Sequence, residues 1–88
     1  MTLARHASTL GIVRLTSLAA AVRVRADLAS GVARATREAS GVTAADVARV
    51  TGVSRQAVSA WETGREVPTV THALAYGRAL AALTPKAA

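Results

Sequence analysis

The sequence predicts an all-α protein, a small bundle of five helices. Three observations support this prediction: apolar residues recur at helical spacing, polar residues suited to N-caps precede the expected helices, and Gly or Pro follows them. The 88 residues provide for one small domain. Hydrophobic residues make up 51% of the chain, but 22 of them are Ala, each of which buries little surface. We therefore expect a thin core that depends on close helix packing and on a second subunit.

The first helix is expected from Ile12 to Arg25, after about ten residues in which nothing predicts regular structure. Its apolar stripe consists of Leu15, Leu18, Ala19 and Val22. The alternation from Val22 to Arg25 also suits a short strand, which is the competing interpretation. Arg14, Arg23 and Arg25 argue against a secretory signal, and no stretch is long enough to span a membrane.

The second helix is expected from Leu28 to Ser40, with Asp27 as its N-cap and Gly41 at its end. Its apolar stripe consists of Leu28, Val32, Ala35 and Ala39. Gly31 lies inside this expected helix, at a cost of up to about 1 kcal/mol relative to Ala.

Two short helices around a tight turn are expected between Thr43 and Gly64. Thr43 and Asp46 form a capping-box pattern, and the apolar positions Val47, Ala48 and Val50 then fall on one side of the helix. Gly52 ends this helix and Ser54 is a suitable N-cap for the next. In that next helix Ala57, Val58 and Trp61 are expected to face the core. Two helices so close in sequence must cross steeply, and the small Ala48 permits close packing near the turn.

The opposite face of the helix from Ser54 to Gly64 is polar and has no apolar partner in the sequence. It carries Arg55, Gln56, Ser59, Ala60 and Thr63. Arg can bind guanine O6 and N7 with two hydrogen bonds, Gln can do the same with adenine, and Ala can contact a thymine methyl group. From amphipathicity alone, a solvated helix face is the alternative interpretation.

The last helix is expected from about Val70 to Leu83, because Pro68 prevents the preceding helix from continuing and Thr69 can cap a new one. Its expected inner face consists of Val70, Ala73, Leu74, Gly77 and Leu80. Thr84 and Pro85 end the helix, so residues 85–88 form a short tail.

The segments REASGVT, VARVTGVSRQAVSAWETG and VP follow one another between Leu28 and Leu83. In this order and spacing they resemble the lambda-repressor-like, or Xre-family, helix-turn-helix domains of bacteria and their phages, over roughly two thirds of the chain. One departure is Thr51, where the family usually has a large apolar residue.

This resemblance implies a recognition helix from Ser54 in the major groove of DNA. Base contacts are then expected from Arg55, Gln56, Ser59 and Ala60. Contacts to the DNA backbone are expected from Thr43, Ala44, Ser54, Thr63 and Arg65. Arg37 and Glu62 stand where many family members form an ion pair between the first helix of the domain and the recognition helix; two independent surface charges are the alternative.

The net charge of +6 favours a polyanionic partner, nucleic acid or a membrane surface. Residues 1–40 hold six Arg against two acids, so most of the excess lies in the N-terminal half. Cys is absent, and His6 and His72 have no third ligand for a metal ion. We find no pattern for a catalytic nucleophile, a pair of catalytic carboxylates or a phosphate-binding loop, and therefore expect no enzyme activity and no cofactor.

These observations predict a DNA-binding transcriptional regulator of the repressor or Cro type, in the cytoplasm of a bacterium or from a phage in a bacterial host. Residues 1–26 are expected to be a helical extension, and residues 27–84 the DNA-binding domain. The extension either adds phosphate contacts or binds a protein. We favour homodimerisation through its apolar stripe; the alternative function is that of an antitoxin-like module that binds another protein through this helix.

Overall fold

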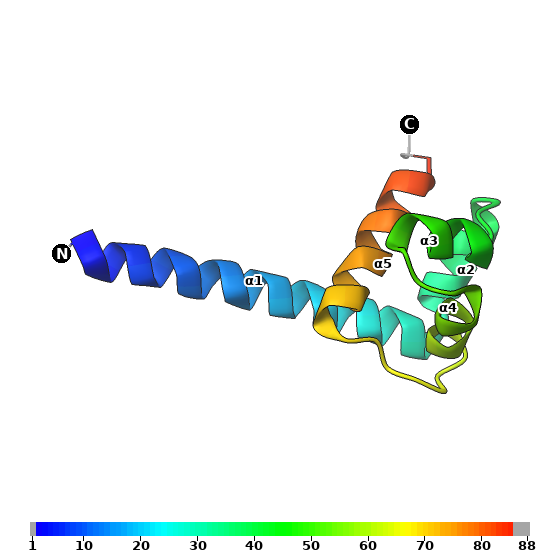
Figure 1. Ribbon diagram of the computed structural model, residues 1–88, viewed down its shortest axis with the longest axis horizontal. Coiled ribbons are helices and arrows are strands. Elements are labelled where there is room, and N and C mark those ends of the chain that lie inside the picture. The colour runs from blue at the N-terminus through cyan, green and yellow to red at the C-terminus, as the bar shows by residue number, and fades with distance from the viewer. Residues whose placement is uncertain (1, 86–88) are drawn as a thin grey trace.

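The computed structural model describes the backbone of residues 2–85 and the side chains of residues 11–85. This part of the chain is all-helical, as predicted, with five helices (Figure 1). They are α1 (Thr2–Ser30), α2 (Val32–Ala39), α3 (Ala44–Thr51), α4 (Arg55–Glu62) and α5 (Val70–Leu83). Helices α2 to α5 gather around the C-terminal half of α1, whose N-terminal half projects away from them.

The long helix α1 corrects three expectations. It begins at Thr2, whereas no regular structure was expected before about Leu10; strong helix formers dominate this stretch and no Pro interrupts it. The strand alternative at Val22 to Arg25 is wrong, because Val22 is exposed and Val24 is packed against the core on another side of the same helix. Asp27 lies inside α1 and is no N-cap, so the helix crosses the expected boundary between residues 26 and 27.

The glycine expected inside the second helix in fact separates two helices. Gly31 has a φ of 87°, a left-handed conformation that glycine adopts at little cost, and the chain changes direction there. This break changes which side of α2 faces inward. Ala33 and Arg37 are therefore buried, whereas Val32, Ala35 and Ala39 of the expected stripe are exposed.

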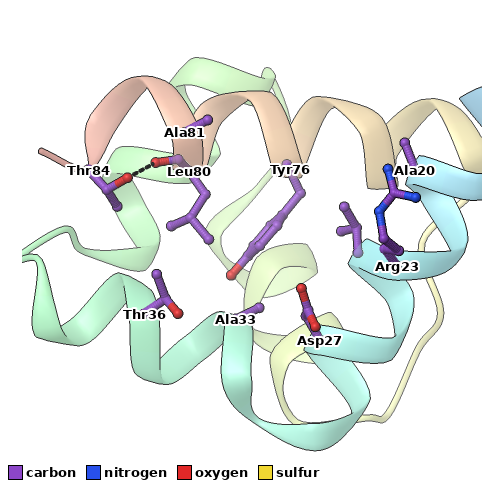
Figure 2. A pocket seen from close by; sticks show the side chains of 11 residues that line it. Ala20, Arg23, Asp27, Ala33, Thr36, Tyr76, Leu80, Ala81 and Thr84 are labelled. Atoms are coloured by element: carbon purple, nitrogen blue, oxygen red, sulfur yellow. Dashed lines mark hydrogen bonds between the residues drawn. The ribbon is translucent and has the colours of Figure 1, made fainter. Parts of the chain in front are cut away.

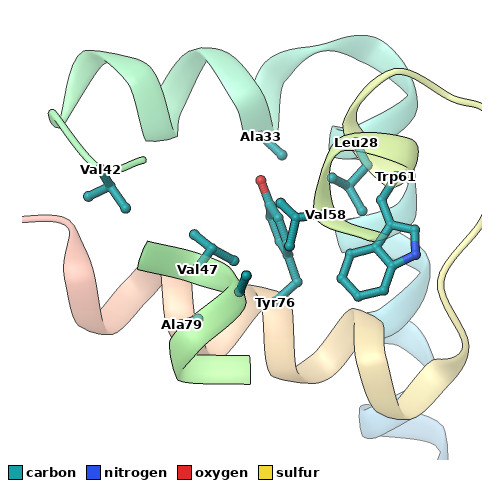
Figure 3. Packing of buried hydrophobic residues seen from close by; sticks show 9 residues of the cluster. Leu28, Ala33, Val42, Val47, Val58, Trp61, Tyr76 and Ala79 are labelled. Carbon is teal, nitrogen blue, oxygen red and sulfur yellow. The ribbon is translucent and has the colours of Figure 1, made fainter. Parts of the chain in front are cut away.

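The core lies where α1, α3, α4 and α5 meet (Figure 3). Val47 and Val58 are completely buried, and Trp61 is buried as predicted. The ring of Trp61 meets that of Tyr76 edge to face, with 6.4 Å between the ring centroids. The core therefore contains both large aromatic residues of the chain.

Two valines expected to face inward are exposed instead. Val50 is on the outer side of α3, and Val70 lies at the first turn of α5, where it is 36% exposed. Tyr76 and Ala79 take the inner positions of α5 together with Ala73. The reason is geometric: α5 packs across α1 and α3, so its buried positions follow a spacing of three residues.

Small side chains leave a cleft of about 400 Å³ between α1, α2 and α5 (Figure 2). Ala20 of α1, Ala33 of α2 and Ala81 of α5 line it, and the ring of Tyr76 forms part of its wall. At the crossing of α1 and α5, Gly77 brings the helices so close that an added Cβ would lie 2.9 Å from a methyl group of Val24. The packing between α1 and α5 is thus tight at Gly77 and open at the neighbouring cleft.

Candidate nucleic-acid interface

The turn between α3 and α4 is held at both ends by local hydrogen bonds. The hydroxyl of Thr43 accepts a hydrogen bond from the N–H of Asp46, and a carboxylate oxygen of Asp46 accepts one from the N–H of Thr43, both at 3.0 Å. This is the predicted capping box. These bonds from Thr43, together with the guanidinium of Arg49, lower the pKa of Asp46, which therefore keeps its charge at neutral pH.

Gly52 ends α3 in the left-handed conformation, with a φ of 76°. Thr51, the departure from the family pattern noted in the sequence, donates a hydrogen bond from its hydroxyl to the carbonyl oxygen of Val47 at 2.8 Å. Its polar atom is therefore satisfied within α3. The hydroxyl of Ser54 then accepts a hydrogen bond from the N–H of Ala57, so α4 begins where the sequence predicted.

Helix α4 presents a polar face to solvent. Arg55 and Gln56 are exposed, Thr63 after the last turn is exposed, and Ser59 is half-buried. The helix buries Val58 and Trp61 on its inner side, and Glu62 is buried beside the exposed face. The side chains expected to contact bases therefore all lie on one helix, and all of them except Ala60 are at least partly exposed.

Ala60 is buried, so the prediction that it lies on the exposed face is wrong. After Gly64 the chain folds back along α4, and the N–H groups of Arg65 and Glu66 both bond to the carbonyl oxygen of Ala60. This segment covers the Ala60 side. Ala60 therefore lies at the base of the shallow cleft that it lines with Gln56, Arg65 and Glu66.

A polar cleft of about 440 Å³ joins one side of α4 to the start of α3. It is lined by Arg55 and Ser59 of α4 and by Thr63 just after it, which are four residues apart and so share one face. Thr43, Ala44 and Ala45 line it at the start of α3. The N–H groups of Ala44 and Ala45 come before the first hydrogen bond within the helix. Backbone N–H groups and positive side chains at a helix N-terminus are suited to a phosphate group.

The remaining expected site residues lie on the other side of α4. Gln56 and Arg65 border a separate shallow cleft with Glu66. The hydroxyl of Thr63 accepts a hydrogen bond from Nε of Arg65 at 3.2 Å, so these two expected backbone contacts are coupled to each other. Ser54 is exposed at the start of α4. The expected residues thus flank α4 on both sides.

Arg37 and Glu62 form the expected ion pair, and it is buried. Two guanidinium nitrogens of Arg37 donate to the two carboxylate oxygens of Glu62 at 2.7 and 2.8 Å. Arg37 also donates to the carbonyl oxygen of Val42, and the hydroxyl of Tyr76 donates to Glu62 at 2.7 Å. The pair therefore ties α2 to α4, the loop before α3, and α5.

The charge states of this network follow from its contacts. Burial by itself raises the pKa of Glu62, but the hydrogen bonds from Arg37 and Tyr76 outweigh it, and the net shift is downward. The bond to Glu62 raises the pKa of Arg37, and burial followed by the bond to Glu62 raises the pKa of Tyr76. Glu62 borders the polar cleft, and its charge is matched there by that of Arg37.

A family model described as a helix-turn-helix domain matches residues 29–87. The chain belongs to the helix-turn-helix domain family. A search of curated proteins and a search of solved structures each found no significant match. The helix-turn-helix domain and the polar face of α4 indicate a DNA-binding regulator.

Two residues of this helix-turn-helix domain were missed in the sequence. Arg34 lines the polar cleft, where it forms an exposed ion pair with Glu38 at 3.3 Å. Its position three residues before Arg37 would have placed both on the same side of α2. Tyr76 gives no such signal, because only the packing of α5 against α4 brings its hydroxyl to Glu62.

His72 is exposed in the first turn of α5, and its ring lies 5.6 Å from that of Trp61. The side chain of His6 and residues 86–88 of the expected tail lie outside the described residues. Among the described residues no group of His, Asp and Glu has an arrangement suited to a metal ion, and no helix combines the length and the apolar character needed to cross a membrane.

Proposed function

We propose that this protein is a sequence-specific transcriptional regulator that represses by occupying an operator, with α4 in the major groove of DNA. The observation that carries this proposal is the exposed polar face of α4, which rises between two clefts lined by positive and hydrogen-bonding groups. Arg55 and Gln56 are the base-reading residues, and Ser59 contributes less because it is half-buried. The role is one of binding, without catalysis or a cofactor.

The neighbouring cleft would fix the domain on the DNA backbone. A phosphate group placed there meets the N–H groups at the start of α3 together with Arg34 and Arg55. The buried pairing of Arg37 with Glu62 supports this role, because an unpaired carboxylate at the cleft would repel phosphate. Thr63 borders the same cleft, and Arg65, whose Nε donates to the Thr63 hydroxyl, is placed to contact the DNA backbone on the other side of α4.

We further propose that the protein binds a palindromic DNA site as a homodimer. It would act in the cytoplasm of a bacterium, or as a phage protein in a bacterial host. One α4 helix reads only a few base pairs, and two subunits related by a two-fold axis place two such helices one turn of DNA apart. The exposed apolar residues of α1 support self-association. They also favour the second candidate, an antitoxin-like module whose α1 binds another protein.

A selection from random DNA duplexes tests the proposal. The full chain, incubated with the pool at fixed salt, should enrich one short motif, and its affinity for that motif should fall steeply as salt rises. A two-fold symmetric motif would support the dimer. Weak binding without any enriched motif would contradict the regulatory function and favour the protein-interaction module.

A further inference from the structure

Helix α1 carries an exposed apolar stripe that no other part of the described chain covers. Leu15, Leu18 and Val22 are 68%, 47% and 53% exposed. Their spacing of three and four residues places them on one side of the helix, and Ala26 and Ala29 continue the same line. Large side chains therefore occupy the first half of the stripe and small ones the second half.

An apolar groove of about 320 Å³ runs beside the small half of the stripe. Ala26 and Ala29 form one wall, Val67 and Pro68 of the loop before α5 form the other, and Trp61 lies at the bottom. Val67 is 73% exposed, which is the highest value among the large apolar side chains of the described residues. The groove has room for large apolar side chains.

We propose that this surface binds the same surface of a second copy of the chain, with the two α1 helices antiparallel and Val22 on the two-fold axis. Leu18 and Ala26 lie four residues on either side of Val22, and Leu15 and Ala29 lie seven residues on either side. In this register each Leu of one copy meets an Ala of the other and enters the groove beside it. A parallel pair would place Leu against Leu and leave both grooves empty.

The charges beside the stripe are complementary in the same register. Arg14 lies on the side of α1 that also carries Leu18 and Arg25, and Glu66 borders the groove. The antiparallel register brings Arg14 of one copy toward the groove that Glu66 of the other borders. Glu66 has no ion pair among the described residues. The side chain of Arg25 is held against the loop before α5, because its Nε donates to the carbonyl oxygen of Pro68 at 2.9 Å.

The size of this contact predicts a weak dimer. The segment from Leu15 to Ala29 is about 21 Å long, so the interface falls at the low end of specific interfaces, with a Kd on the order of micromolar. The inference rests on the homodimer of the proposed function and specifies its interface. The test of the interface uses no DNA. The interface can therefore be overturned while the DNA-binding proposal holds, and the DNA-binding proposal can be overturned while the interface holds.

Sedimentation velocity of the full chain over a concentration series tests the contact. Val22→Asp should raise the dimer Kd at least about a hundredfold, because it removes apolar contact and places two carboxylates together on the axis. Val13→Asp is the matched control: Val13 is 56% exposed on the opposite side of α1 and should leave the Kd unchanged. Circular dichroism should show that both variants stay helical.

Disulfide cross-linking tests the orientation, because the chain has no Cys of its own. Val22→Cys should cross-link to itself, and a mixture of Leu15→Cys with Ala29→Cys should give the mixed dimer. Leu15→Cys alone should not cross-link. Efficient cross-linking of Leu15→Cys to itself would overturn the antiparallel arrangement. A parent chain that stays monomeric at all concentrations would overturn the interface, most clearly if it instead binds vesicles of anionic lipid through α1.

Discussion

At the scale of single residues, the buried contact between Arg37, Glu62 and Tyr76 determines how α4 is held. A buried ion pair stabilises only when its hydrogen-bonding groups are satisfied, and here the carboxylate accepts three hydrogen bonds. The network leaves no buried side-chain nitrogen or oxygen atom without a partner in the described residues. It therefore fixes α4 against α2 and α5 without a polar group left unpaired.

Replacing Glu62 by Gln should destabilise the domain by about 3 kcal/mol near neutral pH, because the buried guanidinium of Arg37 loses its counter-ion. The pKa of Glu62 is lowered in the folded state, so its ionised form stabilises folding above the unfolded pKa of about 4.3. That contribution is lost as the pH falls through the lower, folded pKa. The difference between parent and variant in the free energy of unfolding should therefore shrink under acid.

Urea unfolding from pH 7 to pH 3 measures this difference. Asp46 also has a lowered pKa, but it is present in both proteins and so cancels. A difference that stays constant over the whole range, or is absent at pH 7, would show that the charge on Glu62 does not stabilise the fold.

How well the sequence predicted single residues depended on whether their partners are local. Thr43 and Ser54 cap the groups three residues ahead of them, so their roles follow from the sequence alone. The burial of Ala60 depends on where the chain goes after Gly64, and the hydrogen bond of Tyr76 depends on how α5 packs. Such contacts are not encoded in helical periodicity.

At the scale of elements, Gly31 and Gly77 determine how α1 packs against the domain. Gly31 ends α1 and redirects α2, so that Arg37 points to Glu62. Gly77 permits the close crossing of α1 and α5. The prediction of a single helix from Leu28 to Ser40 was wrong. Helix propensity counts Gly31 only as a residue that destabilises a helix, whereas in the folded protein its left-handed conformation ends α1 and lets α2 pack in a new direction.

Replacing Gly77 by Ala should destabilise the protein by up to about 2 kcal/mol. The gain in helix propensity, up to about 1 kcal/mol, is outweighed by overpacking of about 1 to 3 kcal/mol, because Val24 is short and branched and cannot move aside freely. Gly11→Ala is the matched control. It adds the same methyl group to α1 with nothing within 4 Å, so it should stabilise slightly.

Thermal unfolding of the three proteins, followed by circular dichroism, compares these effects. The melting temperature should fall for Gly77→Ala and rise or stay unchanged for Gly11→Ala. A rise for both variants would mean that α1 and α5 do not cross closely at Gly77.

At the scale of the whole molecule, a compact helix-turn-helix domain is joined to a helix that extends well beyond it (Figure 1). The two halves of α1 have different environments: Ala21 and Leu28 are buried in the domain, whereas Leu15 and Leu18 are exposed. The proposed dimer contact and the proposed DNA contact thereby lie on separate surfaces. A weak dimer would then bind DNA mainly through the combined affinity of two α4 helices.

The overall architecture was largely predictable from the sequence, because caps and glycines mark the ends of α3 and α4. The expectation that α1 ends near Arg25 was not accurate, since no local signal precedes Gly31. This matters for experiments on α1. Removing residues 1–25 would also remove Ala21 and Val24 from the contact with α5, so single substitutions on the exposed stripe are the better test.

The most direct test of the central claim, that α4 reads base pairs through Arg55 and Gln56, is the ratio of affinities for the selected DNA site and a random duplex at one salt concentration. Arg55→Ala and Gln56→Ala should each reduce the discrimination by about 1 to 3 kcal/mol. Arg78→Ala is the matched control: Arg78 is exposed on α5, where it borders a groove between α1 and α5, so its loss removes the same charge and should leave the ratio unchanged. Full discrimination by both α4 variants would contradict base reading by α4.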